Sequence, residues 1–82
     1  MIDSARIWTE SGDVHVDVHG LPPPEPFTAI MELVRARRAP IVVHHEREPL
    51  PLYEALEGCG WAWTRLPGPD GEVRLRLTPR AA

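Results

Sequence analysis

The chain has 82 residues, of which 43% are hydrophobic and 26% are charged. This length suits one small domain and this composition an ordinary globular protein, which excludes a largely disordered or membrane-embedded chain. The formal net charge of -3 argues against a general binder of nucleic acid, for which a clustered positive surface is expected.

The first predicted element is a strand with one buried face. Residues 14–19 alternate between valine and a polar residue, which is the period of such a strand. Its valines are predicted to point inward, and His15, Asp17 and His19 to point the other way. Upstream, residues 5–9 favour an additional edge strand that folds back through a Ser-Gly-Asp turn.

A helix and a second strand follow. The proline-rich residues 20–26 end the first strand, because proline has no amide donor for a sheet. Beyond them, apolar side chains recur at the spacing of an amphipathic helix: Phe27, Ile30, Met31 and Val34. This spacing predicts a helix over about residues 24–37, with prolines tolerated in its first turn. Residues 41–45 favour a short buried strand, parallel to the first because a helix connects the two.

A short helix and a hairpin complete the chain. Apolar residues at helical spacing after residue 51 predict a second helix that is closed by Gly58 and Gly60. Residues 61–66 and 72–78 have strand character and flank a Pro-Gly-Pro-Asp-Gly segment, which is a strong turn signal. We therefore expect an antiparallel hairpin at the end of the chain.

Together these elements follow one another as β-α-β-α-β-β, after the additional N-terminal strand. The order predicts an α/β domain of the α+β two-layer type, in which two helices cover one face of a four-stranded mixed sheet. We expect a single domain over residues 1–82, with its core at about residues 14–78. The other face of the sheet is predicted to be open.

The junction of the first strand and the first helix carries a recognisable motif. Residues 20–26 read Gly-Leu-Pro-Pro-Pro-Glu-Pro, and this segment resembles the Leu-x-Cys-Pro-x-Pro signature of TusA/SirA-like proteins. In that family the cysteine carries a persulfide sulfur between partners. The matching residues here are Leu21, Pro24, Glu25 and Pro26. Pro23 stands where the cysteine would be, so the resemblance implies the fold but removes the nucleophile.

A closer resemblance is to an uncharacterised branch of the same superfamily. That branch has Gly-Leu-Pro-Pro-Pro-Glu-Pro, then Pro-x-Pro-Leu, then a tryptophan-containing hairpin. This chain has the three features at residues 20–26, 49–52 and 61–63, so the similarity spans about residues 14–78. Members of the branch occur alone or attached to other domains, including hemerythrin-like ones, and the resemblance implies no settled biochemical activity.

The histidines are candidates for a metal or haem site. His15, Asp17 and His19 belong to the first strand, and His44 and His45 end the strand predicted beside it. Imidazole and carboxylate together ligate zinc, and imidazole can ligate haem iron. No Cys-x-x-Cys or His-x-x-x-His spacing accompanies these residues, and any solvated sheet face shows the same alternation. We therefore expect no cofactor, and a histidine-based metal or haem site stays an alternative.

The hairpin carries a second candidate site. Trp61 and Trp63 share one face of its first strand, and Arg74 and Arg76 share one face of its second. If these faces coincide, stacking and cation–π contacts would form a platform on the open sheet face for an anionic or aromatic ligand, a protein partner or a second copy. Otherwise the tryptophans pack against the helices. In place of a partner, Trp8 and the N-terminal segment would then cover the open face. Both alternatives remain open.

Two further features have mainly structural interpretations. The start of the first helix favours an anion, but Pro24 and Pro26 remove amide donors there and Glu25 adds a repelling carboxylate. Cys59 lies between two glycines at the expected end of the second helix, where the negative end of the helix dipole blunts its reactivity. A single cysteine cannot form an internal disulfide. No apolar run approaches the roughly 18 residues that cross a bilayer. The polar start lacks the features of a signal peptide. We therefore expect a cytoplasmic protein without membrane contact.

The sequence contains no recognisable catalytic set. A Ser/His/Asp arrangement, a glycine-rich phosphate loop and a positioned carboxylate pair are all missing from it. We therefore expect a non-enzymatic binding or protein-interaction module for a protein partner or small ligand. Two alternatives stay open: sulfur transfer or redox chemistry through Cys59, and metal or haem binding by the histidines. The candidate ligand- or partner-binding residues are His19, Pro23, Glu25, His44, His45, Trp61, Trp63, Arg74 and Arg76.

Overall fold

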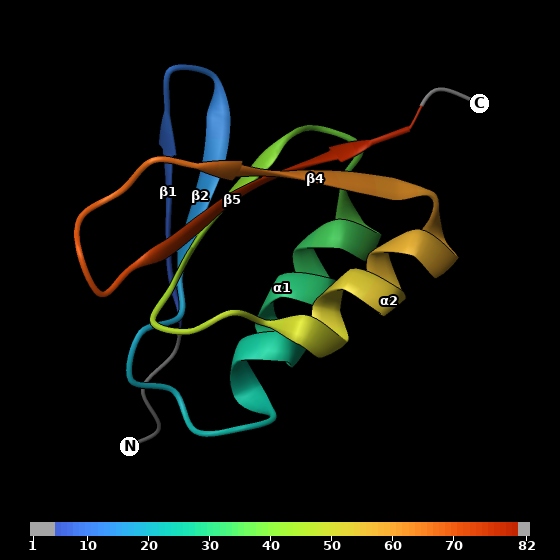
Figure 1. The fold of residues 1–82 in the computed structure, drawn as a ribbon. Coiled ribbons are helices and arrows are strands. Elements are labelled where there is room, and N and C mark those ends of the chain that lie inside the picture. The colour runs from blue at the N-terminus through green and yellow to red at the C-terminus, as the bar shows by residue number, and fades with distance from the viewer. Residues whose placement is uncertain (1–4, 81–82) are drawn as a thin grey trace.

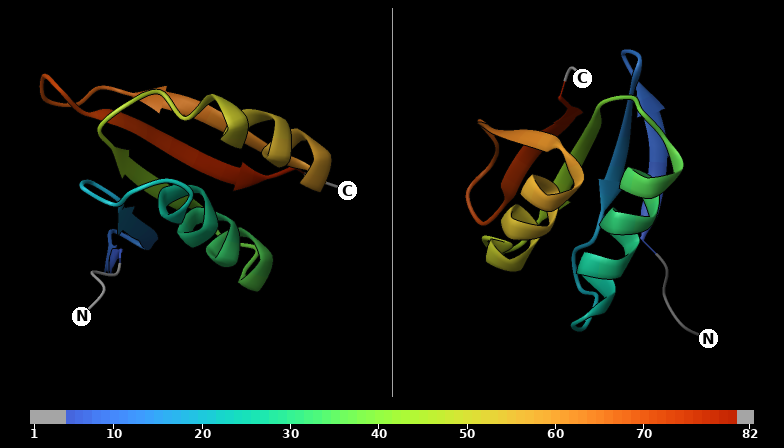
Figure 2. Two further views of the ribbon diagram at one scale, coloured as in Figure 1. Left: turned by 90° about the horizontal axis from the view of Figure 1, so that it is seen from below. Right: turned by 90° about the vertical axis from the view of Figure 1, so that its right-hand side faces the viewer.

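The computed structural model describes residues 5–80 of the chain. Both helices cover the same face of one sheet, which gives two layers (Figures 1 and 2). The elements in chain order are β1 (Arg6–Glu10), β2 (Asp13–Asp17), α1 (Glu25–Ala36), β3 (Ile41–His45), α2 (Leu50–Cys59), β4 (Trp61–Leu66) and β5 (Val73–Pro79). No helix within residues 5–80 is long and apolar enough to span a membrane.

The sheet has five strands in the order β1-β2-β3-β5-β4. β2 and β3 are parallel, and the other three neighbouring pairs are antiparallel. The predicted mixed sheet with two helices is therefore confirmed, with the N-terminal strand as its fifth member. Because β3 lies between β2 and β5, it is central and buried on both faces.

The turn between β1 and β2 explains why the N-terminal strand forms. Ser11 and Gly12 both have positive φ angles, 52° and 85°, as a two-residue type I′ hairpin requires. Glycine adopts such an angle without steric cost. This turn sets the register that places Trp8 opposite His15.

A continuous apolar core lies between the sheet and the helices. The valines of residues 14–18 are buried and His15 and Asp17 lie on the other face, so the predicted alternation is confirmed. The buried cluster consists of Val16, Val18, Ile30, Met31, Val34, Ile41, Val43, Leu52, Leu56, Trp61, Leu75 and Leu77. Burial of this apolar surface is the main term that stabilises a domain of this size.

Two details of the helices differ from the prediction. Phe27 was expected on the buried stripe of α1 but is 37% exposed, because it lies in the first turn, beyond the edge of the core. Gly58 was expected to help close the second helix but lies inside α2. Gly60 closes the helix instead, since its φ of 79° gives the left-handed conformation that ends helices.

Candidate functional site

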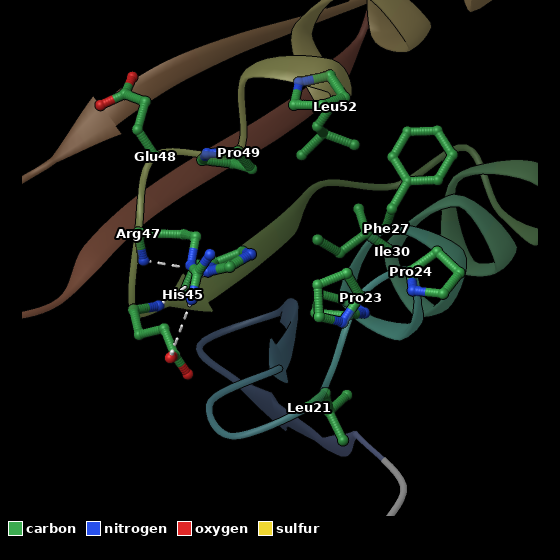
Figure 3. A pocket seen from close by; sticks show the side chains of 13 residues that line it. Leu21, Pro23, Pro24, Phe27, Ile30, His45, Arg47, Glu48, Pro49 and Leu52 are labelled. Carbon is green, nitrogen blue, oxygen red and sulfur yellow. Dashed lines mark hydrogen bonds and ion pairs between the residues drawn. The ribbon is translucent and has the colours of Figure 1, made fainter.

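A pocket of about 250 Å³ opens where both helices begin (Figure 3). One wall comes from the segment between β2 and α1, and the other from the segment between β3 and α2. Because β2 and β3 are parallel, their carboxyl ends meet at this edge of the sheet. Open α/β sheets commonly bind ligands at such an edge.

Prolines form much of the pocket wall. Pro24 and Pro49 directly precede α1 and α2, and each helix also has a proline in its first turn. Proline is tolerated there because the first amides of a helix lack intrahelical acceptors. The apolar part of the lining consists of Leu21, Pro23, Pro24, Pro26, Phe27, Ile30, Pro49, Pro51 and Leu52.

His45 is the buried polar side chain of this pocket. It ends β3, is only 6% exposed, and its ring points toward the pocket interior (Figure 3). Its Nδ1 accepts hydrogen bonds from the backbone N–H groups of Glu46, at 2.9 Å, and Arg47, at 3.2 Å. Because both partners are donors, Nδ1 carries no proton, and the neutral ring must carry its proton on Nε2. Burial lowers the pKa of His45 and outweighs the opposite effect of the Glu46 carboxylate.

The Nε2–H group of His45 faces the pocket and has no hydrogen-bond partner among residues 5–80. Within residues 5–80 the Nδ1 bonds are the hydrogen bonds of this ring. No fully enclosed side-chain nitrogen or oxygen in the same part of the chain lacks a partner. The Nε2 atom is therefore reachable from the pocket, where a water or a ligand atom can accept its hydrogen bond.

Charged side chains surround the pocket mouth. Glu46 accepts a hydrogen bond from the Gly20 amide at 2.6 Å, which joins the two pocket walls and lowers the pKa of Glu46. Glu48 accepts from the Tyr53 hydroxyl at 2.7 Å and from Arg65 at 3.1 Å. Burial and the bond to Glu48 raise the pKa of Tyr53 to about 12. The Glu46 and Glu48 carboxylates are thus already engaged by the protein.

A second polar group of residues lies on the opposite sheet face. We call Trp8, His15, His44, Glu72 and Arg74 the open-face cluster. Nδ1 of His15 lies 2.9 Å from Nε2 of His44, and Nδ1 of His44 lies 3.0 Å from Oε2 of Glu72. Arg74 donates to the same Glu72 oxygen at 2.7 Å. The Trp8 ring contacts both imidazoles, with centroid distances of 5.2 Å.

The tryptophans and arginines of the hairpin do not share a sheet face. Trp63 pairs with Leu77 across β4 and β5 and stacks on Tyr53 of α2 at 4.7 Å. Trp61 is buried in the core, so both tryptophans lie on the helix side. Arg74 and Arg76 lie on the open face. The idea that Trp61 or Trp63 gives the open face apolar anchors is therefore wrong, and Trp8 covers part of that face instead.

The remaining candidates are spread over several places. His44 and His45 are adjacent in β3, so they point to opposite sheet faces, and only His45 reaches the pocket. His19 is exposed, its Nδ1 lies 2.6 Å from Oδ1 of Asp17, and it is not part of the pocket lining. Within residues 5–80 no three or more His, Cys, Asp or Glu side chains come together as a metal site.

The sequence interpretation found part of the pocket and missed the rest. Pro23 lines the pocket as a candidate residue, whereas Glu25 is the first residue of α1 and is not part of the lining. Phe27, Arg47 and the second proline pair were not recognised as site residues. The signal available in the sequence was that a proline-rich segment precedes both helices.

Comparison with protein families adds a relationship for most of the chain. Residues 15–79 match the family model described as an uncharacterized conserved protein, DUF2249. The chain belongs to the DUF2249 family. The matched span of this DUF2249 domain contains the whole pocket and the open-face cluster except Trp8. Searches of curated proteins and of solved structures gave no significant match.

Proposed function

We propose that this DUF2249 domain is a non-enzymatic binding module whose ligand occupies the pocket at the starts of α1 and α2. One observation carries the proposal: a largely apolar pocket contains a buried imidazole whose N–H group points inward and is unpartnered within the described part of the chain. Pockets for small molecules combine apolar walls with a few placed polar groups in this way. The volume of about 250 Å³ suits a small ligand.

The state of His45 favours binding over catalysis. A general base or a metal ligand needs a lone pair on the accessible nitrogen. In His45 the lone pair lies on Nδ1 and is held by two backbone amides, while the accessible nitrogen carries the proton. The ring is therefore suited to hold a ligand by a hydrogen bond rather than to abstract a proton or bind a metal.

A relationship to TusA/SirA-like proteins forms a second part of the proposal. Its support is the proline motif at the start of α1, where Pro23 takes the place of the sulfur-carrying cysteine and lines the pocket. Cys59 is exposed at the far end of α2, about 10 Å along the helix from Leu52 of the pocket lining at the usual rise of a helix. Sulfur transfer through Cys59 would therefore need a separate site, so we favour ligand binding in the pocket.

A small molecule is favoured over a protein partner. The open sheet face lacks the hairpin tryptophans, and its two β5 arginines are already paired within the chain: Arg74 with Glu72, and Arg76 with Asp13. Interfaces depend on buried aromatic anchors rather than on paired charges. We also propose a cytoplasmic location, which rests on the single cysteine, because one cysteine cannot form an internal disulfide.

Native mass spectrometry of the protein purified from its own cells tests this proposal. We expect a retained small molecule on the wild-type domain and a loss of that mass in Phe27→Ala, which removes part of the pocket wall. Leu50→Ala is the matched control, because Leu50 is an exposed apolar residue at the same end of the molecule but does not line the pocket. Equal retention in both variants, or retention of a protein partner in place of a small molecule, would contradict the proposal.

A further inference from the structure

The geometry of His45 also limits the chemistry of the ligand, on the condition that the proposed function is correct. We infer that the pocket selects a neutral ligand with a hydrogen-bond acceptor, such as a ketone, ester or ether oxygen, on a small apolar body. His45 is the residue that determines this specificity, because its Nε2–H is the donor that faces the pocket.

The backbone fixes the donor role of His45. The other neutral tautomer would place an Nδ1–H group against the N–H groups of Glu46 and Arg47, at 2.9 and 3.2 Å. That tautomer would lose both hydrogen bonds and bring donors face to face, and protonation of the ring would do the same. The imidazole therefore presents a donor to the pocket and offers no acceptor.

A cation or a donor-bearing ligand is disfavoured by this arrangement. Such a ligand would meet the Nε2–H of His45 with a second donor, and neither group would be satisfied in a pocket whose other walls are mostly proline, Phe27 and aliphatic side chains. The carboxylates of Glu46 and Glu48 at the mouth have the opposite effect, because they attract cations. The choice between a ketone and an ammonium ligand therefore tests the donor directly.

An anionic ligand is disfavoured for a different reason. Prolines remove several amide donors at the two helix starts. The amides of Leu50 and Leu52 are bonded to the backbone oxygens of Glu48 and Pro49. The lining also contains two carboxylates, Glu46 and Glu48, against one guanidinium, Arg47. A neutral acceptor satisfies His45 without opposing this charge.

Three ring-matched probes separate these classes: cyclopentanone, cyclopentylammonium and cyclopentanecarboxylate. Each is titrated into the full-length, isotope-labelled protein, and the dissociation constant is read from amide shifts of pocket residues. We expect cyclopentanone to bind about five- to tenfold more tightly than either charged probe, the range that one hydrogen bond provides. A long-range proton–nitrogen spectrum of the wild-type imidazoles is expected to show His45 protonated at Nε2.

Two conservative variants connect the preference to His45. In His45→Asn the side-chain oxygen can replace Nδ1 as acceptor for the two amides, but no donor of residue 45 reaches the position of Nε2, so the preference for cyclopentanone should be lost. In His45→Gln the side-chain amide reaches the position of Nε2, so the preference should largely remain. Amide shifts of Glu46 and Arg47 report whether either variant disturbs the loop.

The possible results separate the two proposals. If the ammonium or carboxylate probe binds the pocket as tightly as cyclopentanone, or if His45 proves to be protonated at Nδ1, this inference is overturned while pocket binding stands. If none of the three probes shifts the pocket amides, the proposed function fails and the inference fails with it. The tautomer measurement uses the wild-type protein and so does not depend on the folding of any variant.

Discussion

His15 and His44 are joined ring to ring across two parallel strands, with Nδ1 of His15 2.9 Å from Nε2 of His44. The direction of this bond follows from Glu72, whose carboxylate accepts from Nδ1–H of His44 at 3.0 Å. Neutral His44 must then accept at Nε2, so His15 donates and its own Nε2 keeps a lone pair. Two histidines on opposite faces of the sheet thus differ in their free nitrogen: an acceptor in His15 and a donor in His45.

The first prediction concerns the stability of the domain between pH 7 and about pH 5. Burial lowers the pKa of His45 below its ordinary value of 6.5, so the unfolded chain binds this proton more readily than the folded one. The stability that this histidine provides is therefore complete above about pH 6.5 and is lost as the pH falls below it. We expect the melting temperature of the wild type to fall over this interval and that of His45→Asn to fall less.

The carboxylates act in a lower pH range, so they do not obscure this result. Burial by itself would raise the pKa of both Asp17 and Glu72. Hydrogen bonds outweigh this effect and lower both pKa values: Asp17 bonds to His19, and Glu72 bonds to Arg74 and His44. Their contribution is present above their ordinary pKa values of 3.8 and 4.5 and is lost at still lower pH. Equal slopes for wild type and His45→Asn between pH 7 and about pH 5 would show that His45 is not held neutral by the fold.

The second prediction tests the alternation of β2. Val16→Asp should destabilise the domain far more than His15→Ala, because Val16 is fully buried in the core and His15 lies on the open face. An unpaired buried carboxylate costs several kcal/mol, which is comparable to the whole stability of a small domain. Urea denaturation followed by circular dichroism gives both values, and similar midpoints would contradict the register.

Local patterns predicted those parts of the fold that one element determines by itself. The valine alternation fixed the buried face of β2, and the bounds of residues 41–45 agree with β3, because each signal lies within a single segment. The faces of β3 were not predictable in the same way. A central strand is buried on both sides, so its sequence Ile-Val-Val-His-His shows no alternation that would tell which of His44 and His45 faces the helices.

The candidate site depended on relationships between distant segments, and most of these were not predictable. Which face Trp63 occupies is set by its pairing with Leu77, and a slip of one residue in the hairpin would reverse it. The pocket forms because two proline-rich segments precede two helices that begin at the same edge of the sheet. These segments are far apart in the sequence, since Pro24 and Pro49 are separated by 25 positions. Each segment alone indicates only a helix start.

The third prediction is that Pro23→Cys does not restore a sulfur carrier. Reactive cysteines need a positive surrounding that stabilises the thiolate, whereas the pocket that residue 23 lines contains two carboxylates, Glu46 and Glu48, against one guanidinium, Arg47. A matching surface for the donor enzyme is required as well. The variant should be made in a Cys59→Ser background and incubated with a cysteine desulfurase. Rapid persulfide formation at residue 23, detected by mass spectrometry, would show that the proline alone blocks sulfur transfer.

The last prediction concerns the contribution of Trp8 to stability. Trp8 stacks on His15 and contacts His44, so it attaches the edge strand β1 to the open-face cluster. Its neighbour Ile7 is 57% exposed on the other side of the same strand and serves as a matched control. Aromatic pairs contribute about 0.5–1.5 kcal/mol beyond the area that they bury, whereas exposed substitutions usually change stability by about 0.5 kcal/mol or less.

We therefore expect Trp8→Ala to lower the free energy of unfolding by about 1–2 kcal/mol and Ile7→Ala to have a clearly smaller effect. The values should be measured by urea denaturation followed by circular dichroism, since removal of a tryptophan changes the fluorescence signal directly. Hydrogen exchange adds a local measurement, because loss of the stack should weaken protection in β1 and β2 before it affects β4 and β5. If Ile7→Ala costs as much as Trp8→Ala, β1 is held mainly by its backbone pairing with β2, and the aromatic contact with the histidines contributes little.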